Sequence, residues 1–237
     1  MFRKKILFEV CANSIQSALN AQLAQADRIE LCENLEVGGT TPNIALIRQT
    51  KQQLHIPIHI LIRPRAGNFF YSEEEFTTMI QQIESCKYLN VDGIIMGLLN
   101  DDLTLDKIRC AELIQLARPL SVTFHRAFDI VSDPFQTLEE LINLGADRIL
   151  TSGQKEDILE GSELINQLVK HAGDNLSILA GGGITEANIV ELAEKCGAHE
   201  FHFSAKVQSA DGSYVSDPDR IRKIRNLANS SFHSIDN

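Results

Sequence analysis

Eight short apolar segments, separated by stretches with helical spacing, constrain the fold of this chain more than any other feature. The segments expected to form strands are Ile6–Val10, Arg28–Leu31, Ile58–Ile62, Gly93–Met96, Val122–His125, Arg148–Thr151, Ser177–Ala180 and Glu200–Phe203. Alternation of this kind is typical of parallel strands joined by crossover helices. Eight units in 237 residues predict an α/β fold, a single (β/α)8 barrel of the TIM type, which needs about 250 residues.

A doubly wound open sheet is the competing architecture. It usually has fewer strands and a glycine-rich turn after the first one. Here the first strand continues from Glu9 to Ser14 without a glycine, and no linker interrupts the chain. We therefore expect one domain over residues 1–237, with residues 207–237 as a C-terminal helix and polar tail, and no nucleotide cofactor.

Several helix ends are marked in the sequence. Ser72 and Glu75 match a capping box, and Thr185 and Gly197 match the start and end of another helix. A cap residue precedes a proline at Thr41-Pro42, Asp133-Pro134 and Asp217-Pro218. One internal repeat gives minor support to a duplicated half-barrel: Ala26-Asp27-Arg28-Ile29 recurs 120 residues later as Ala146-Asp147-Arg148-Ile149.

Polar residues gather at the predicted C-terminal ends of the strands, where barrel chemistry is expected. Alternation along each strand assigns them to the lumen, so the mouth should bring together Glu9, Glu30, Arg63, His125 and His202. Glu30 or Glu9 is a candidate general base, His125 a candidate acid or electrophile, and Arg63 a candidate clamp for an anion. The alternative interpretation is a structural layer of ion pairs.

The turn Gly181-Gly182-Gly183 is typical of a phosphate cradle, because glycines let backbone N–H groups approach an anion. Ser204 after the eighth strand would complete it, and Arg65 and Arg126 would assist. The simpler interpretation is a tight turn that needs positive φ angles.

Cys11 and Cys32 fall at the ends of neighbouring strands, which lie about 4.8 Å apart. Two thiolates at that separation suit a soft metal such as Cu(I). The alternative is that both are small buried apolar groups. The other three cysteines, Cys86, Cys110 and Cys196, lie on helical faces and are expected in the core. Without an HxH pair, a zinc hydrolase is not expected.

Charge and composition exclude other classes of protein. The net charge is −10, which disfavours nucleic acid and anionic membranes as partners. No run of 18 apolar residues predicts a transmembrane helix, and the apolar segment after Lys5 is too short for a signal peptide. Five dispersed cysteines, with no CxxC pair, favour a reducing cytosol.

Taken in order, these segments resemble the CutC family, which is named for copper homeostasis. The resemblance covers roughly residues 6–206. The matching pieces are Glu9–Ser14, Arg28–Leu35 with Gly38–Pro42, Ile62–Tyr71, Thr123–Asp129, Leu150–Gly153 and Phe201–Ala205. It implies a cytoplasmic (β/α)8 barrel that forms a homo-oligomer, a dimer or larger. It also implies a role in copper handling, with Cys11 and Cys32 at the positions of the proposed copper ligands.

Two main hypotheses follow. The first is a Cu(I)-binding protein that buffers or traffics copper through Cys11 and Cys32. The second is an enzyme acting on a small anionic or phosphorylated metabolite at the C-terminal face of the barrel. A non-catalytic scaffold with an acidic interaction surface is a third, less favoured reading.

Overall fold

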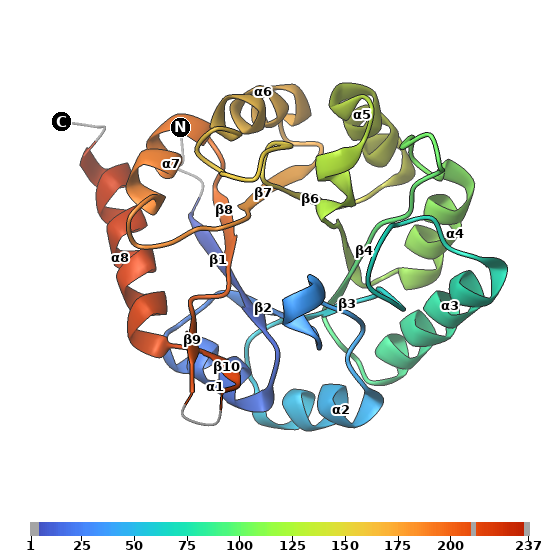
Figure 1. Ribbon diagram of the computed structural model, residues 1–237, viewed down its shortest axis with the longest axis horizontal. Coiled ribbons are helices and arrows are strands. Elements are labelled where there is room, and N and C mark those ends of the chain that lie inside the picture. Colours follow the sequence, from blue (N-terminus) through green and yellow to red (C-terminus); the bar gives the residue numbers. More distant parts are fainter. Residues whose placement is uncertain (1–4, 210–211, 235–237) are drawn as a thin grey trace.

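The computed structural model describes residues 5–209 and 212–234, and it confirms the predicted architecture. Eight parallel strands close into a barrel in the order β1 to β8, each hydrogen-bonded to the next and β8 to β1 (Figure 1). Their bounds are β1 Leu7–Ala12, β2 Arg28–Leu31, β3 Ile58–Leu61, β4 Gly93–Met96, β5 Ser121–Phe124, β6 Arg148–Thr151, β7 Ser177–Gly181 and β8 Glu200–Phe203.

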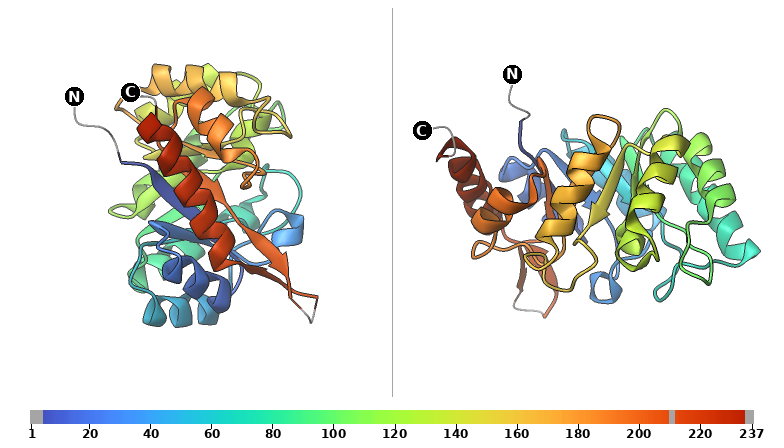
Figure 2. Two further views of the ribbon diagram at one scale, coloured as in Figure 1. Left: turned by 90° about the vertical axis from the view of Figure 1, so that its left-hand side faces the viewer. Right: turned by 90° about the horizontal axis from the view of Figure 1, so that it is seen from above.

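A ring of helices surrounds the barrel (Figures 1 and 2). They are α1 Ile15–Leu23, α2 Ile44–Gln53, α3 Glu73–Tyr88, α4 Lys107–Ala117, α5 Pro134–Leu144, α6 Ser162–Ala172, α7 Ile189–Cys196 and α8 Pro218–Ser234, with short 3-10 helices η1 Leu35–Val37 and η2 Arg126–Ile130. None of the described helices is long and apolar enough to cross a membrane.

The main hydrophobic core lies between the strands and the helices. The residues predicted to face the helices, such as Ile58, Ile60 and Phe201, are fully buried there. Phe8 of β1 stacks against Phe201 of β8 with ring centroids 6.2 Å apart. Since neighbours along a strand point to opposite faces, the polar residues between these positions point into the barrel.

The predicted helix starts are confirmed in part. Ser72 and Glu75 form both hydrogen bonds of a capping box, and the Asp133 side chain caps α5 directly before Pro134. The prediction for Thr41 is wrong: its N–H donates to the Arg63 carbonyl, so the chain stays extended until Asn43, which caps α2.

The turn after β7 is longer than predicted. Thr185 does not begin a helix: its N–H donates to the Asn188 side chain across a turn, and α7 starts only at Ile189. Gly197 ends that helix at a φ of +66°, as expected from its sequence.

The C-terminal region contains a hairpin that the sequence did not indicate. Strands β9, Lys206–Gln208, and β10, Tyr214–Ser216, pair antiparallel beside α1, and the Ser216 N–H donates to Ser17 of that helix. Helix α8 follows as the eighth helix of the barrel, with Ile221 and Ile224 fully buried. Residues 235–237 of the expected polar tail lie outside the described residues.

Candidate functional site

A cavity of about 440 Å³ opens at the C-terminal ends of the strands. Because residues from seven of the eight strand ends meet there, it brings together positions that are far apart in the chain. The predicted residues that line it are Cys11, Glu30, Cys32, Arg63, His125, Arg126, Gly182, Gly183, His202 and Ser204.

Three predicted site residues do not line the cavity. Glu9 is fully buried one layer below it, and Gly181 belongs to strand β7. The Arg65 guanidinium turns away to pair with Glu75 at 2.5 Å and to donate to backbone carbonyls of its own loop. The long arginine side chain reaches the carboxylate that caps α3, so it is not available to an anion in the cavity.

The two thiols meet at the rim of strands β1 and β2. The Sγ atoms of Cys11 and Cys32 are 3.6 Å apart, and the residues are 6% and 1% exposed. Their backbones are joined by the hydrogen bond from the Cys32 N–H to the Ala12 carbonyl. The hydrogen bond between the thiols, burial and the nearby Glu30 and Glu9 raise the pKa of Cys11 well above its usual value. The Cys11 thiol is therefore paired with Cys32 and poorly ionised.

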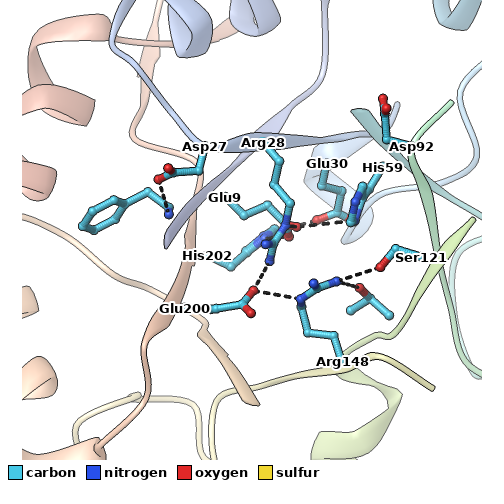
Figure 3. Close-up of polar contacts among 12 residues, drawn as sticks. Glu9, Asp27, Arg28, Glu30, His59, Asp92, Ser121, Arg148, Glu200 and His202 are labelled. Atoms are coloured by element: carbon cyan, nitrogen blue, oxygen red, sulfur yellow. Dashed lines mark hydrogen bonds and ion pairs between the residues drawn. The ribbon is translucent and has the colours of Figure 1, made fainter. Parts of the chain in front are cut away.

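A histidine and a glutamate stand beside this pair. Ligand atoms of Cys11, Glu30 and His202 all lie within 4.8 Å of one another. His202 Nε2 is 3.3 Å from Glu30 Oε2, and its Nδ1 is 2.8 Å from Glu9 Oε1. His202 thus links the buried carboxylate to the cavity, and Figure 3 shows the three side chains close together.

Burial raises the pKa of Glu30 to about 8, with His202 opposing the shift and Cys32 and Glu9 adding to it. For His202, burial lowers the pKa, but the hydrogen bond to Glu9 and the charge of Glu30 outweigh it and raise the pKa overall. The pair therefore retains a proton in the neutral range.

Below the mouth lies the layer of ion pairs that the alternative interpretation anticipated (Figure 3). Arg28 pairs with Glu9 and, at 2.5 Å, with Glu200, while Arg148 donates to the same Glu200 oxygen at 2.8 Å. Burial raises the pKa of Glu9, yet the Arg28 and His202 interactions hold it well below the usual range. Glu9 is therefore an ionised structural group that orients His202.

The two copies of the sequence repeat each contribute an arginine to this layer. Arg28 and Arg148 occupy equivalent places in the two copies, and the aspartates before them also match. Asp27 accepts the Phe8 N–H at 2.9 Å, and Asp147 accepts the Val122 N–H at 2.7 Å. Both arginines lie at the starts of their strands, away from the C-terminal ends on which the predicted site was based.

Arg63 connects two loops at the rim of the cavity through hydrogen bonds. Its Nη1 donates to the carbonyls of Val37 and Gly39 at 3.0 and 2.7 Å, and its Nη2 donates to Gly67 at 2.9 Å. The guanidinium also stacks on Phe69 at 5.2 Å. Most of its donors are thus committed to the loops after β2 and β3, which weakens the case for an anion clamp at this position.

His125 is a buried neutral imidazole. Burial, aided by the charge of Arg63, lowers its pKa to about 3. Its Nδ1 accepts the Ala127 N–H at 3.1 Å, so the ring proton is on Nε2, which has no partner among the described residues. The ring lies against Gly97, where a Cβ would approach Nδ1 to 2.5 Å. This glycine was missed, since nothing in the sequence marks a contact across strands.

These features define a class: a TIM barrel with a thiol pair, a glutamate and a histidine at the C-terminal face of its strands. Comparison with known proteins narrows it. The model of the CutC family matches residues 6–207, and the chain belongs to the CutC family.

The relatives are similar over most of the chain. A human "Copper homeostasis protein cutC homolog" is 46% identical over 84% of this chain and 73% of its own length. A "family protein CutC" of Parabacteroides distasonis is 47% identical over 85% of this chain and 84% of its own.

A solved structure of a related protein has the same fold. The crystal structure titled putative copper homeostasis protein CutC from Streptococcus agalactiae has a TM-score of 0.80 and 34% identity, covering 84% of this chain and 98% of that one. A phosphoribosylanthranilate isomerase from Pyrococcus furiosus, with a TM-score of 0.58, 15% identity and coverage of 95% and 99%, shares the barrel fold alone.

Proposed function

We propose that this protein takes part in copper homeostasis by binding Cu(I) through Cys11 and Cys32 at the barrel mouth. The observation that carries the proposal is the 3.6 Å separation of the two Sγ atoms in a cavity open to small solutes. Thiolates are the ligands that Cu(I) prefers. The names of the relatives, which refer to copper homeostasis, support the same assignment.

The sulfur separation favours a bent site with further ligands. Two metal–sulfur bonds of about 2.3 Å span about 3.8 Å at a tetrahedral angle and about 4.6 Å in a straight line. The observed 3.6 Å is close to the former value. A Cu(I) ion between the thiols therefore leaves room on one side for a third ligand.

His202 suits the role of third ligand. Its Nε2 faces the cavity next to Cys11, while its Nδ1 is held by Glu9 at 2.8 Å. A histidine whose second nitrogen bonds a carboxylate is the usual arrangement at metal sites, because the carboxylate fixes the orientation of the ring. Glu30 is a harder oxygen ligand, and we assign it to the surroundings of a soft ion.

A titration against a chromophoric Cu(I) chelator tests the proposal. The wild-type protein should take one Cu(I) from the chelator, and a Cys11→Ser/Cys32→Ser variant should lose at least a hundredfold in affinity. A Cys86→Ala/Cys196→Ala variant keeps the same number of thiols as the first and should bind like wild type. Equal affinity in the two double variants would rule out the mouth thiols as ligands.

We also propose a cytoplasmic location and a homo-oligomer, a dimer or larger. The dispersed, unpaired cysteines support the cytoplasmic location, because all five are free thiols in the structure.

The net charge of −10 supports the expectation that neither nucleic acid nor an anionic membrane is a partner. Sedimentation analysis of the purified protein measures the oligomeric state directly.

An enzyme acting on a small anionic or phosphorylated metabolite is a second candidate. The size of the cavity favours it, since about 440 Å³ falls in the range of small-molecule sites and exceeds what one ion needs. In such an enzyme Glu30 would be the base and the Nε2–H of His125 a hydrogen-bond donor. A thermal-shift screen with phosphorylated sugars and carboxylates tests it, because a ligand that binds the folded state raises the melting temperature.

A further inference from the structure

The wall of the cavity formed by the ends of β5, β6 and β7 differs from the thiol side in its chemistry. Arg126, Gly182 and Gly183 line it, and Ser152 lies directly behind the arginine. These residues take no part in the proposed copper site. They present hydrogen-bond donors where the thiol side presents acceptors and sulfur.

Arg126 is held in place by its neighbours. Its Nε donates to Asp129 at 2.7 Å and its Nη2 donates to Ser152 Oγ at 3.0 Å. Asp129 also accepts the Thr151 hydroxyl and the Ser152 N–H, so this carboxylate is anchored by the end of β6. Within the described ranges, Arg126 Nη1 has no hydrogen-bond partner, which leaves one edge of a fixed guanidinium facing the cavity.

The glycine turn places backbone donors beside that guanidinium. Gly182 and Gly183 have φ angles of +130° and +79°, and a Cβ on Gly182 would lie 3.4 Å from Arg126 Cζ. Among residues 5–209 and 212–234, the backbone N–H groups of Gly182, Gly183 and Ile184 meet no acceptor. A Cβ on Gly183 would have nothing within 4 Å, so this turn faces open space. Successive unpaired N–H groups of this kind form an anion-binding concavity.

A second, independent observation points to a ligand in the same cavity. His125, which is 5% exposed, carries its proton on an Nε2 that has no partner among the described residues. Leaving a buried donor unpaired is costly, and an acceptor oxygen on a ligand would satisfy it. The residue next to it in sequence is Arg126, so both donors come from the end of β5.

We propose that this wall binds the phosphate group of a small phosphorylated metabolite, held by Arg126 Nη1 and the backbone N–H groups of Gly182 and Gly183. These three donors provide one hydrogen bond for each terminal oxygen of a phosphate ester, and the guanidinium supplies the positive charge that phosphate attracts. His125 Nε2 donates to another oxygen of the same ligand. This inference deepens the second candidate function, and it stands whether or not copper binds at the thiols.

Inorganic phosphate is the probe for the test. Titration of the metal-free wild-type protein at constant ionic strength, followed by calorimetry and phosphorus NMR, should give saturable binding with one site per chain. Arg126→Gln should weaken the affinity at least tenfold. Arg222→Gln changes the charge equally on the outer surface of α8 and should bind like wild type, as should Cys11→Ser/Cys32→Ser. The last variant separates this site from the copper proposal.

Gly183→Ala provides a second variant that leaves the guanidinium intact. Its Cβ meets no neighbouring atom, but an L-residue is strained at a φ of +79°, so the turn should shift. Phosphate affinity should fall about fivefold while the circular dichroism spectrum stays that of wild type. Binding that is absent in the wild type, or equally strong in Arg126→Gln, would overturn the inference. Acetate binding as tight as phosphate binding would overturn the assignment to phosphate esters.

Discussion

Arg28 and Arg148, one from each copy of the sequence repeat, donate to the same oxygen of Glu200, at 2.5 and 2.8 Å. The three side chains lie inside the barrel, little exposed, below the cavity. Arg28 continues the network to Glu9, which orients His202. The polar interior of the barrel therefore has two layers, a structural one of ion pairs and a functional one at the mouth.

Removing the shared carboxylate should therefore lower the free energy of unfolding. Glu200→Gln leaves two buried guanidinium groups without their common partner, and we expect a loss of about 3 kcal/mol in the free energy of unfolding. Urea denaturation measures it. Glu191→Gln is the matched control, because its exposed pair with Lys195 is worth less than about 0.5 kcal/mol. Similar small losses in both variants would show that the ion-pair layer does not stabilise the fold.

The stability should fall in mild acid because of His59. Burial lowers the pKa of His59 to about 4, with Glu9 opposing the shift and Arg28 adding to it. Between its unfolded value of about 6.5 and this folded value, the unfolded chain binds more protons, so stability rises with pH in that window and falls as pH drops. From pH 7 to pH 5 we expect His59 to account for a loss of about 2 kcal/mol.

Chemical denaturation of the protein and its variants at pH 7 and pH 5 measures this dependence. His59→Leu should flatten it by about the same 2 kcal/mol, whereas His55→Gln, at an exposed position, should keep the wild-type slope. If the slope stays unchanged in His59→Leu, then this histidine is not the neutral buried group described above.

Much of the fold follows from the sequence because the strand count and the two-residue period are both visible in it. The meeting of Cys11 and Cys32 follows from the same logic, since parallel strands end on one side. The depth of a side chain inside the barrel does not follow from the sequence pattern. Glu9 and Cys11 share a face, but two residues along a strand is about 6.6 Å, enough to bury the one and place the other at the cavity.

The remaining errors concern the connections between the barrel strands and helices. Arg65 and Arg126 look equivalent in sequence, yet Glu75 binds the first and Asp129 fixes the second at the cavity. Such pairings depend on where loops bring a carboxylate, and no local pattern encodes that. The β9–β10 hairpin was missed for a different reason: strands of three residues carry too little periodic signal.

Gly97 should tolerate no side chain while His125 is present. A Cβ there would lie 2.5 Å from the His125 ring, so Gly97→Ala should cost about 2 kcal/mol of stability. In a His125→Ala background the same change should cost much less, because the ring is gone. A double-mutant cycle measured by denaturation checks this, and additive losses would mean that the two residues do not contact each other.

His202 should contribute to the affinity for copper. His202→Asn removes the nitrogen next to the thiols, and we expect Cu(I) affinity to drop about tenfold, with the thiols retaining the rest. Glu9→Gln should have a smaller effect of the same sign on copper affinity, because it loosens the orientation of the ring. It should also destabilise the fold, because Arg28 loses one of its two carboxylate partners. Competition titrations provide the measurement, and wild-type affinity in His202→Asn would limit the site to two sulfurs.

X-ray absorption at the copper edge, on protein loaded with one equivalent of Cu(I), tests the central claim most directly. The spectrum should show two sulfur ligands for the wild type and for Cys86→Ala/Cys196→Ala, and none for Cys11→Ser/Cys32→Ser. A copper environment built only from nitrogen and oxygen, or one unchanged in the Cys11→Ser/Cys32→Ser protein, would contradict it.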